Sequence, residues 1–115
     1  MVHASKPWTN EAISVASKNL NIYFDISAWE GEFKFAPVAL IQTLAQAKLA
    51  CGIKKVLFGS DWPLFTPLVS LKDWGEGIKK LKIPPPLKLM GLPELTEEEK
   101  KMILGGNASE IYGLK

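Results

Sequence analysis

Two short apolar runs constrain the fold of this chain more than any other feature. Residues 21–27 read NIYFDIS and residues 54–60 read KKVLFGS, and each run carries apolar side chains at consecutive positions, hence on both faces of a strand. Strands buried on both faces are typical of parallel sheets that helices cover on either side. Two strands cannot bury each other in this way, so the sequence predicts a sheet that needs further strands or a partner chain.

Helical patterns alternate with these two runs. A proline triplet at residues 84–86 predicts an extended connection between the later helices. The order helix, strand, helix, strand, helix predicts an α/β fold with parallel strands. The first expected helix is residues 10–19, with Thr9 as N-cap and an apolar stripe of Ile13, Ala16 and Leu20. The second runs from Pro37 to Cys51 and is followed by Gly52, and the third runs from Thr66–Pro67 to about Leu81. The fourth runs from a capping box at Thr96 and Glu99 to about Leu104.

Composition excludes several classes of function. The net charge is +2, and the fourteen basic residues form no stripe of the kind that binds nucleic acid. No apolar run approaches the roughly 20 residues that cross a bilayer, and no signal peptide is visible, so we expect no membrane association. A single cysteine, Cys51, fits a reducing compartment and predicts a cytoplasmic protein. A single histidine, His3, excludes a three-histidine zinc site within the chain.

Asp61 is the candidate functional residue that position alone singles out. It follows the second apolar run in Gly59-Ser60-Asp61-Trp62-Pro63, where a proline ends the strand. Parallel α/β folds place their chemistry at the C-terminal ends of strands. A carboxylate at such an end is a candidate metal ligand or general base, and a cap for the turn before Trp62 is an equally open interpretation.

Four stretches carry a resemblance to a known family: residues 2–8, 21–27 and 56–63, and residues 95–99 together with 103–108. In this order they resemble the C-terminal portion of the amidohydrolase-related metal-dependent hydrolases. These are TIM-barrel enzymes of the amidohydrolase superfamily, which also contains non-oxidative decarboxylases. The resemblance implies that residues 1–115 form a partial domain, a C-terminal fragment of a (β/α)8 barrel. It would run from the end of strand six through strand eight to the closing helices.

The resemblance implies roles for the two residues nearest to the expected chemistry. Asp61 would be a metal ligand, or a proton shuttle for a metal-bound water. His3 would polarise the substrate carbonyl or act as an acid and base. A histidine on a frayed terminus, with no function in the isolated chain, is the alternative for His3.

Further residues are expected near the same strand ends. Ser27, Trp29 and Trp62 would lie at the rim where substrates enter, although core packing explains tryptophans more often. Asp25 would orient groups of the site or make a structural hydrogen bond. Gly59 would allow a close approach beside Asp61.

The implied activity is that of a metal-dependent hydrolase acting on C–N or C–O bonds, in an amide, ester or lactone of a small carboxylated molecule, with a divalent metal, zinc, as cofactor. Non-oxidative decarboxylation by the same kind of barrel and a non-catalytic interaction domain are the alternatives. The family's His-x-His pair and strand-five histidine are absent here, which leaves His3 and Asp61 as candidate ligands. We therefore expect no tight metal binding and negligible activity in this chain alone, and possible pairing of copies through an exposed sheet edge.

Overall fold

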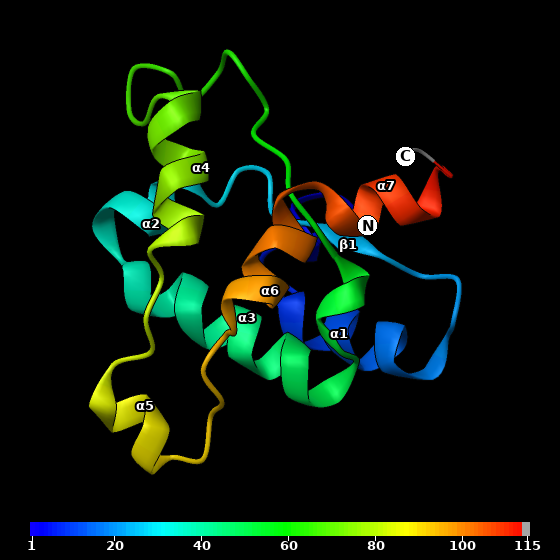
Figure 1. Ribbon diagram of the computed structural model, residues 1–115. Coiled ribbons are helices and arrows are strands. Elements are labelled where there is room, and N and C mark those ends of the chain that lie inside the picture. Colours follow the sequence, from blue (N-terminus) through cyan, green and yellow to red (C-terminus); the bar gives the residue numbers. More distant parts are fainter. Residues whose placement is uncertain (114–115) are drawn as a thin grey trace.

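The computed structural model describes residues 1–113, in which two short strands pair in parallel. Strand β1 (Phe24–Asp25) lies beside β2 (Val56–Leu57), with Phe24 opposite Val56 and Asp25 opposite Leu57. Helical segments surround this pair (Figure 1). They are η1 (Val2–Ser5), α1 (Thr9–Lys18), α2 (Glu30–Phe35), α3 (Pro37–Ala50), η2 (Ile53–Lys55), α4 (Leu71–Lys79), α5 (Pro85–Leu89), α6 (Glu97–Lys101), η3 (Met102–Gly106) and α7 (Asn107–Ile111).

The parallel α/β arrangement predicted from the sequence is confirmed for this pair of strands. The position of each strand in an eight-stranded barrel stays a prediction. The ladder is shorter than the apolar runs, and each strand segment also meets a non-strand segment on its outer edge. The backbone N–H of Asp25 donates to the carbonyl of Met1 (3.0 Å), and that of Phe58 donates to the carbonyl of Ile103 (3.0 Å). The expected exposed edge is therefore partly covered, and oligomerisation stays a prediction.

Helix α3 forms as its sequence predicts. Pro37 occupies the first turn, where a missing N–H costs nothing, and Leu40, Leu44 and Ala47 are buried along one side. Gly52 follows the helix with a φ of 85°, a positive value that glycine adopts more easily than other residues. The capping box at Thr96 and Glu99 is also confirmed, at the start of α6.

The predicted start of the third helix is wrong. Helix α4 begins at Leu71, because the hydroxyl of Ser70 accepts a hydrogen bond from the N–H of Asp73 (3.1 Å) and caps the first turn. Thr66 and Pro67 lie in the preceding turns. The helix after Thr96 also differs from expectation, since α6 ends at Lys101 and continues as the π-helical turn η3.

Two other local predictions are corrected. Thr9 lies inside α1 rather than capping it, and Leu20 falls beyond the helix with 92% of its surface exposed. The proline triplet is extended only at Pro84, because Pro85 and Pro86 are tolerated in the first turn of α5. Figure 1 shows α5 standing apart from the other helices.

The main core lies between the strands and helices α1, α3 and α4. Its most completely buried large side chains are Trp74, Phe24, Ile26, Leu40, Leu44, Ile78 and Ile103. A second, smaller cluster joins α3 to α5 through Ala45, Ile83 and Leu87. Within residues 1–113, no helix has the length and apolar character needed to span a membrane.

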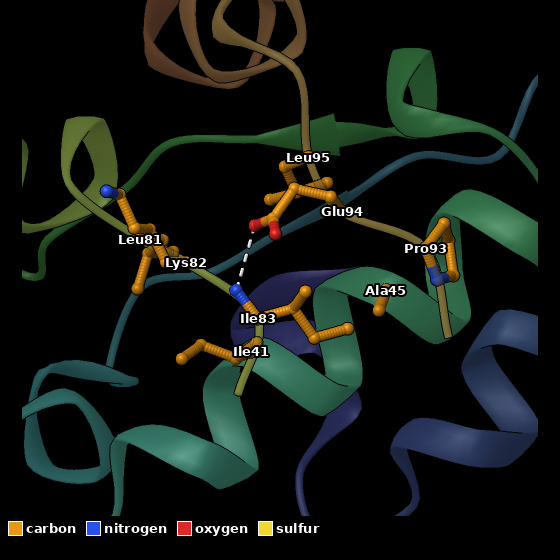
Figure 2. A pocket seen from close by; sticks show the side chains of 8 residues that line it. All are labelled: Ile41, Ala45, Leu81, Lys82, Ile83, Pro93, Glu94 and Leu95. Carbon is orange, nitrogen blue, oxygen red and sulfur yellow. Dashed lines mark hydrogen bonds between the residues drawn. The ribbon is translucent and has the colours of Figure 1, made fainter. Parts of the chain in front are cut away.

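A hydrogen bond between Ile83 and Glu94 lies at a small pocket beside the second cluster. Figure 2 shows the carboxylate of Glu94 accepting the backbone N–H of Ile83, at 2.8 Å, above Ile41 and Ala45 of α3. This hydrogen bond, together with Lys88, lowers the pKa of Glu94 below its ordinary value. The hydrogen bond joins the two segments that flank α5. The pocket is lined by residues other than those of the candidate site.

Candidate active site

The structure brings His3 and Asp61 together. Nε2 of His3 lies 3.3 Å from Oδ2 of Asp61, and the two side chains are 37% and 38% exposed. His3 comes from η1, whereas Asp61 follows β2, so the fold joins residues 58 positions apart in the chain (61 minus 3). Partial exposure leaves the pair accessible to a small molecule in solution.

Asp61 is held by its backbone, which leaves its carboxylate free for His3. Its φ is 50°, in the left-handed region that aspartate tolerates better than most residues. The carbonyl of Asp61 accepts the N–H of Leu64 (2.9 Å), while the hydroxyl of Ser60 accepts the N–H of Trp62 (3.2 Å). The turn is therefore stabilised by Ser60 and by main-chain atoms, and the carboxylate of Asp61 has no capping hydrogen bond among the contacts of this turn.

His3 is anchored by several contacts. Its carbonyl accepts hydrogen bonds from the indole Nε1 of Trp29 (3.0 Å) and from the N–H of Lys6 (3.1 Å). Its own backbone N–H donates to Oδ1 of Asp25 (3.2 Å). These bonds tie η1 to the end of β1, so the segment that carries His3 is fixed rather than frayed.

Ser27 and Asp25 surround the other side of the imidazole. Nδ1 of His3 lies 2.8 Å from the hydroxyl oxygen of Ser27 and 3.0 Å from its carbonyl oxygen. Oδ1 of Asp25 accepts the N–H of Ser27 (3.0 Å) and is also in close hydrogen-bond contact with its hydroxyl. A continuous set of contacts thus runs from Asp25 through Ser27 and His3 to Asp61.

Gly59 permits the close approach of the two strand ends. A Cβ at this position would lie 3.0 Å from Cβ of Ser27 and 3.5 Å from Oδ1 of Asp25. The carbonyl of Gly59 accepts the indole Nε1 of Trp74 (2.8 Å), which fixes the chain just before Asp61 to α4. The predicted close packing at Gly59 is therefore present, and its neighbours are Ser27 and Asp25 of the other strand end.

The three predicted substrate contacts lie in different surroundings. Trp62 is 66% exposed beside Asp61, which places it where a ligand could touch it. Ser27 is buried and contacts His3. Trp29 is 5% exposed and packs in the core, with the ammonium of Lys6 5.0 Å from its ring centre, so the core-packing alternative describes it better than a rim position.

A shallow groove opens beside the pair. It has a volume of about 400 Å³, within the range typical of small-molecule sites. Asp25, Ser27 and Asp61 are among the polar residues of its lining, and Leu57 and Phe58 contribute apolar surface. A small polar molecule could lie in this groove against Asp61.

Sequence reasoning missed Glu30, the first residue of α2. It is 1% exposed, and its Oε2 has no hydrogen-bond partner. Burial raises the pKa of the Glu30 carboxyl above its ordinary value; the backbone N–H groups of Glu30 and Ala28 oppose that rise, and the charge of Asp61 adds to it. Acidic residues in a first helical turn are usually solvated, so the sequence gives no signal for this burial.

The described residues supply only part of a metal site. An imidazole nitrogen and a carboxylate oxygen are ligands that zinc accepts, and a catalytic zinc usually has about three protein ligands. Within residues 1–113, no group of three or more His, Cys, Asp or Glu side chains could hold a metal ion. His3 and Asp61 are therefore two suitable donors that do not complete a site by themselves.

The structure places a histidine and a carboxylate side by side at the C-terminal end of a parallel strand, the end at which parallel α/β folds carry their active sites. The family model described as "Amidohydrolase" matches residues 1–114, and the chain therefore belongs to the amidohydrolase superfamily. Members of this superfamily generally use divalent metals and adopt TIM-barrel folds. No curated protein and no solved structure matches the chain.

Proposed function

We propose that this chain carries the His3 and Asp61 portion of a metal-dependent hydrolase that cleaves an amide, ester or lactone bond in a small carboxylated molecule. The observation that carries the proposal is the 3.3 Å contact between Nε2 of His3 and Oδ2 of Asp61, at the end of β2 and beside an open groove. Membership of the amidohydrolase superfamily supports the hydrolytic class of reaction.

The two side chains have complementary tasks in this proposal. When bound, a divalent metal would polarise the carbonyl group of the substrate and lower the pKa of a bound water. Asp61 accepts a proton from the attacking water and orients it, because its carboxylate is accessible and faces the groove. His3 holds Asp61 in place through Nε2 and exchanges a proton with it. Trp62 offers an apolar surface to the substrate.

Zinc binding to the purified chain tests the role of the pair. We expect weak binding of Zn²⁺ by calorimetry, since two donors hold a cation poorly. Binding should weaken further in Asp61→Asn and His3→Gln. Asp73→Asn, an exposed aspartate on α4, is the matched control and should bind as the unaltered chain does. Zinc binding that neither Asp61→Asn nor His3→Gln alters would contradict the proposed site.

Turnover is measured in parallel with p-nitrophenyl esters, lactones and amides, with and without Zn²⁺. Release of CO₂ from aromatic carboxylates is included, because decarboxylation by the same family would use the same pair. We expect negligible turnover by the chain alone. Zinc-dependent ester or lactone hydrolysis that Asp61→Asn abolishes would establish the hydrolase and overturn the expected inactivity, whereas CO₂ release would favour the decarboxylase.

A further inference from the structure

Glu30 carries a buried carboxylate oxygen that the fold leaves unpaired. The residue is 1% exposed, and its Oε2 has no hydrogen-bond partner among residues 1–113. The backbone N–H groups of Glu30 and Ala28 favour the charged form of the carboxyl, whereas burial and the charge of Asp61 oppose it. A buried carboxylate oxygen without a donor or a cation is costly, so a ligand that supplies both would stabilise it.

The basic residue whose charge acts on Glu30 is engaged elsewhere. The ammonium of Lys6 donates to the carbonyl of Ala28 (2.7 Å) and to both carboxylate oxygens of Glu32 (3.0 and 2.9 Å). It also lies 5.0 Å from the ring centre of Trp29. Lys6 therefore favours the charge of Glu30 from a distance but gives no hydrogen bond to Oε2.

A small cavity lies against Glu30. Its volume is about 10 Å³, roughly what one water-sized group needs. Its lining includes three aromatic side chains and two hydroxyl groups, from Trp62, Phe65 and Trp74 and from Ser60 and Thr66. Trp62 is 66% exposed, so this side of the cavity reaches the surface.

A primary ammonium group matches these surroundings better than other cations do. Its three N–H groups can donate both to a carboxylate and to hydroxyl oxygens. The faces of aromatic rings attract its charge, but they supply none of the oxygen ligands that hard metal cations require. A quaternary ammonium has no N–H to donate, and its methyl groups make it larger than one water-sized group.

We propose that Glu30, with Trp62, Phe65 and Trp74, forms a binding site for the primary ammonium group of a small molecule. Ser60 lines both this cavity and the groove beside Asp61, so the rest of the ligand would extend toward the groove. A role of the site in selecting an amine-bearing substrate rests on the proposed hydrolase function, whereas binding of the ammonium group does not.

Binding is tested by ¹H–¹⁵N NMR of the purified chain, with methylammonium chloride as the probe. Sodium chloride and tetramethylammonium chloride at the same ionic strength are the comparison salts. We expect methylammonium alone to shift the indole N–H signals of Trp62 and Trp74 saturably. The signal of Trp8, which is not part of the cavity lining, should stay in place. A titration of the unaltered chain without saturation, or equal affinity for either comparison salt, would overturn the proposal.

Glu30→Gln tests the carboxylate, because glutamine keeps the size of the side chain and removes its charge. It should weaken methylammonium binding by at least about 10-fold, since a hydrogen bond to a charged group is lost. Glu11→Gln, at an exposed position on α1, is the matched control and should bind as the unaltered chain does. Unchanged affinity in a folded Glu30→Gln variant would contradict the site.

Trp62→Leu tests the aromatic part at an exposed position. Read from the signal of Trp74, binding should be about 2- to 5-fold weaker, because an attraction between the cation and an exposed ring is lost. Trp8→Leu changes another exposed tryptophan, 65% exposed, and should leave the affinity unaltered. Equal affinities of the two tryptophan variants would contradict the aromatic part of the site.

Failure of the ammonium site and failure of the hydrolase proposal are distinguishable. Methylammonium binding is measured without metal or substrate, so the absence of turnover leaves the titration as it is. If binding depends on Glu30, the site stands even when no tested ester, lactone or amide is cleaved. Hydrolysis by a chain that binds no methylammonium would remove the ammonium site and leave the hydrolase proposal.

Discussion

The side-chain amide of Asn107 donates a hydrogen bond to the carbonyl of Val56 at 2.8 Å, across 51 residues of sequence. The same amide donates to the carbonyl of Ile53, also at 2.8 Å. Asn107 is 3% exposed, so its amide takes the place of water as the hydrogen-bond donor to these two carbonyl groups at the start of β2. The strand that leads to Asp61 is thus fixed at its beginning by α7.

We expect Asn107→Ala to lower the free energy of unfolding by about 1–3 kcal/mol, because it leaves buried carbonyl groups without a donor. Urea denaturation followed by tryptophan fluorescence measures the change. Asn10→Ala, at an exposed position on α1, is the matched control and should change stability by less than about 0.5 kcal/mol. Equal stability of the two variants would show that Asn107 does not hold β2.

Local patterns predicted those elements whose signals are contained in a few neighbouring residues. The Thr96 and Glu99 capping box and the Pro37 start with Gly52 after the end of α3 depend on backbone groups within one or two turns. The start of α4 was missed because two candidate caps compete over five residues. Ser70, rather than Thr66, makes the capping hydrogen bond.

The candidate site was predictable in part. The position of Asp61 after an apolar strand and the resemblance both singled it out, and the structure places it beside His3. The burial of Glu30 and the contact of Ser27 with His3 depend on segments that are distant in sequence. Neither has a local signal, because Glu30 lies against residues 60–74 and Ser27 meets His3 across 24 residues of sequence.

Glu30→Gln should make the chain more stable at neutral pH. Below its ordinary pKa of 4.5 the carboxyl of Glu30 is neutral in both folded and unfolded chains. As pH rises above 4.5, the unfolded chain releases this proton while the folded chain retains it, because burial raises the pKa in the folded state. Unfolding is then increasingly favoured until the pH passes the folded-state pKa. Glutamine stays neutral and avoids this loss.

Urea denaturation from pH 4 to 8 measures the effect of Glu30→Gln. The stability of the unaltered chain should fall relative to that of the variant above pH 4.5, and the difference should be greatest at neutral pH. Glu11→Gln, at an exposed position on α1, is the control and should follow the unaltered chain. A variant that is less stable than the unaltered chain at neutral pH would mean that the Glu30 carboxylate is stabilised by a partner.

Cys51 should react slowly with alkylating reagents in the folded chain. Burial raises the pKa of its thiol, and the thiol donates a hydrogen bond to the carbonyl of Ala47 (3.3 Å) that a thiolate could not make. The thiolate is the reactive form, so fewer molecules are competent at neutral pH. Iodoacetamide labelling followed by mass spectrometry should be slower in buffer than in urea. Equal rates would show that the end of α3 is open in solution.

Two glycines of α4 provide a paired test of how α2 packs on α4. A Cβ at Gly75 would meet no atom within 4 Å, whereas a Cβ at Gly77 would overlap the ring of Phe33. Phe33 is itself packed against Trp74, with ring centres 5.5 Å apart, so its ring has little freedom to move away. Alanine is favoured over glycine within a helix by about 1 kcal/mol when nothing obstructs it.

We therefore expect Gly75→Ala to raise the free energy of unfolding by about 0.5–1 kcal/mol and Gly77→Ala to lower it by about 1–3 kcal/mol. Combining Gly77→Ala with Phe33→Leu should cost less than the sum of the two single changes, because the smaller side chain leaves room for the new methyl group. Urea denaturation of the unaltered chain, Gly77→Ala, Phe33→Leu and the double variant measures the coupling energy between the two positions. If Gly77→Ala were as stabilising as Gly75→Ala, the ring of Phe33 would not lie against α4 in solution.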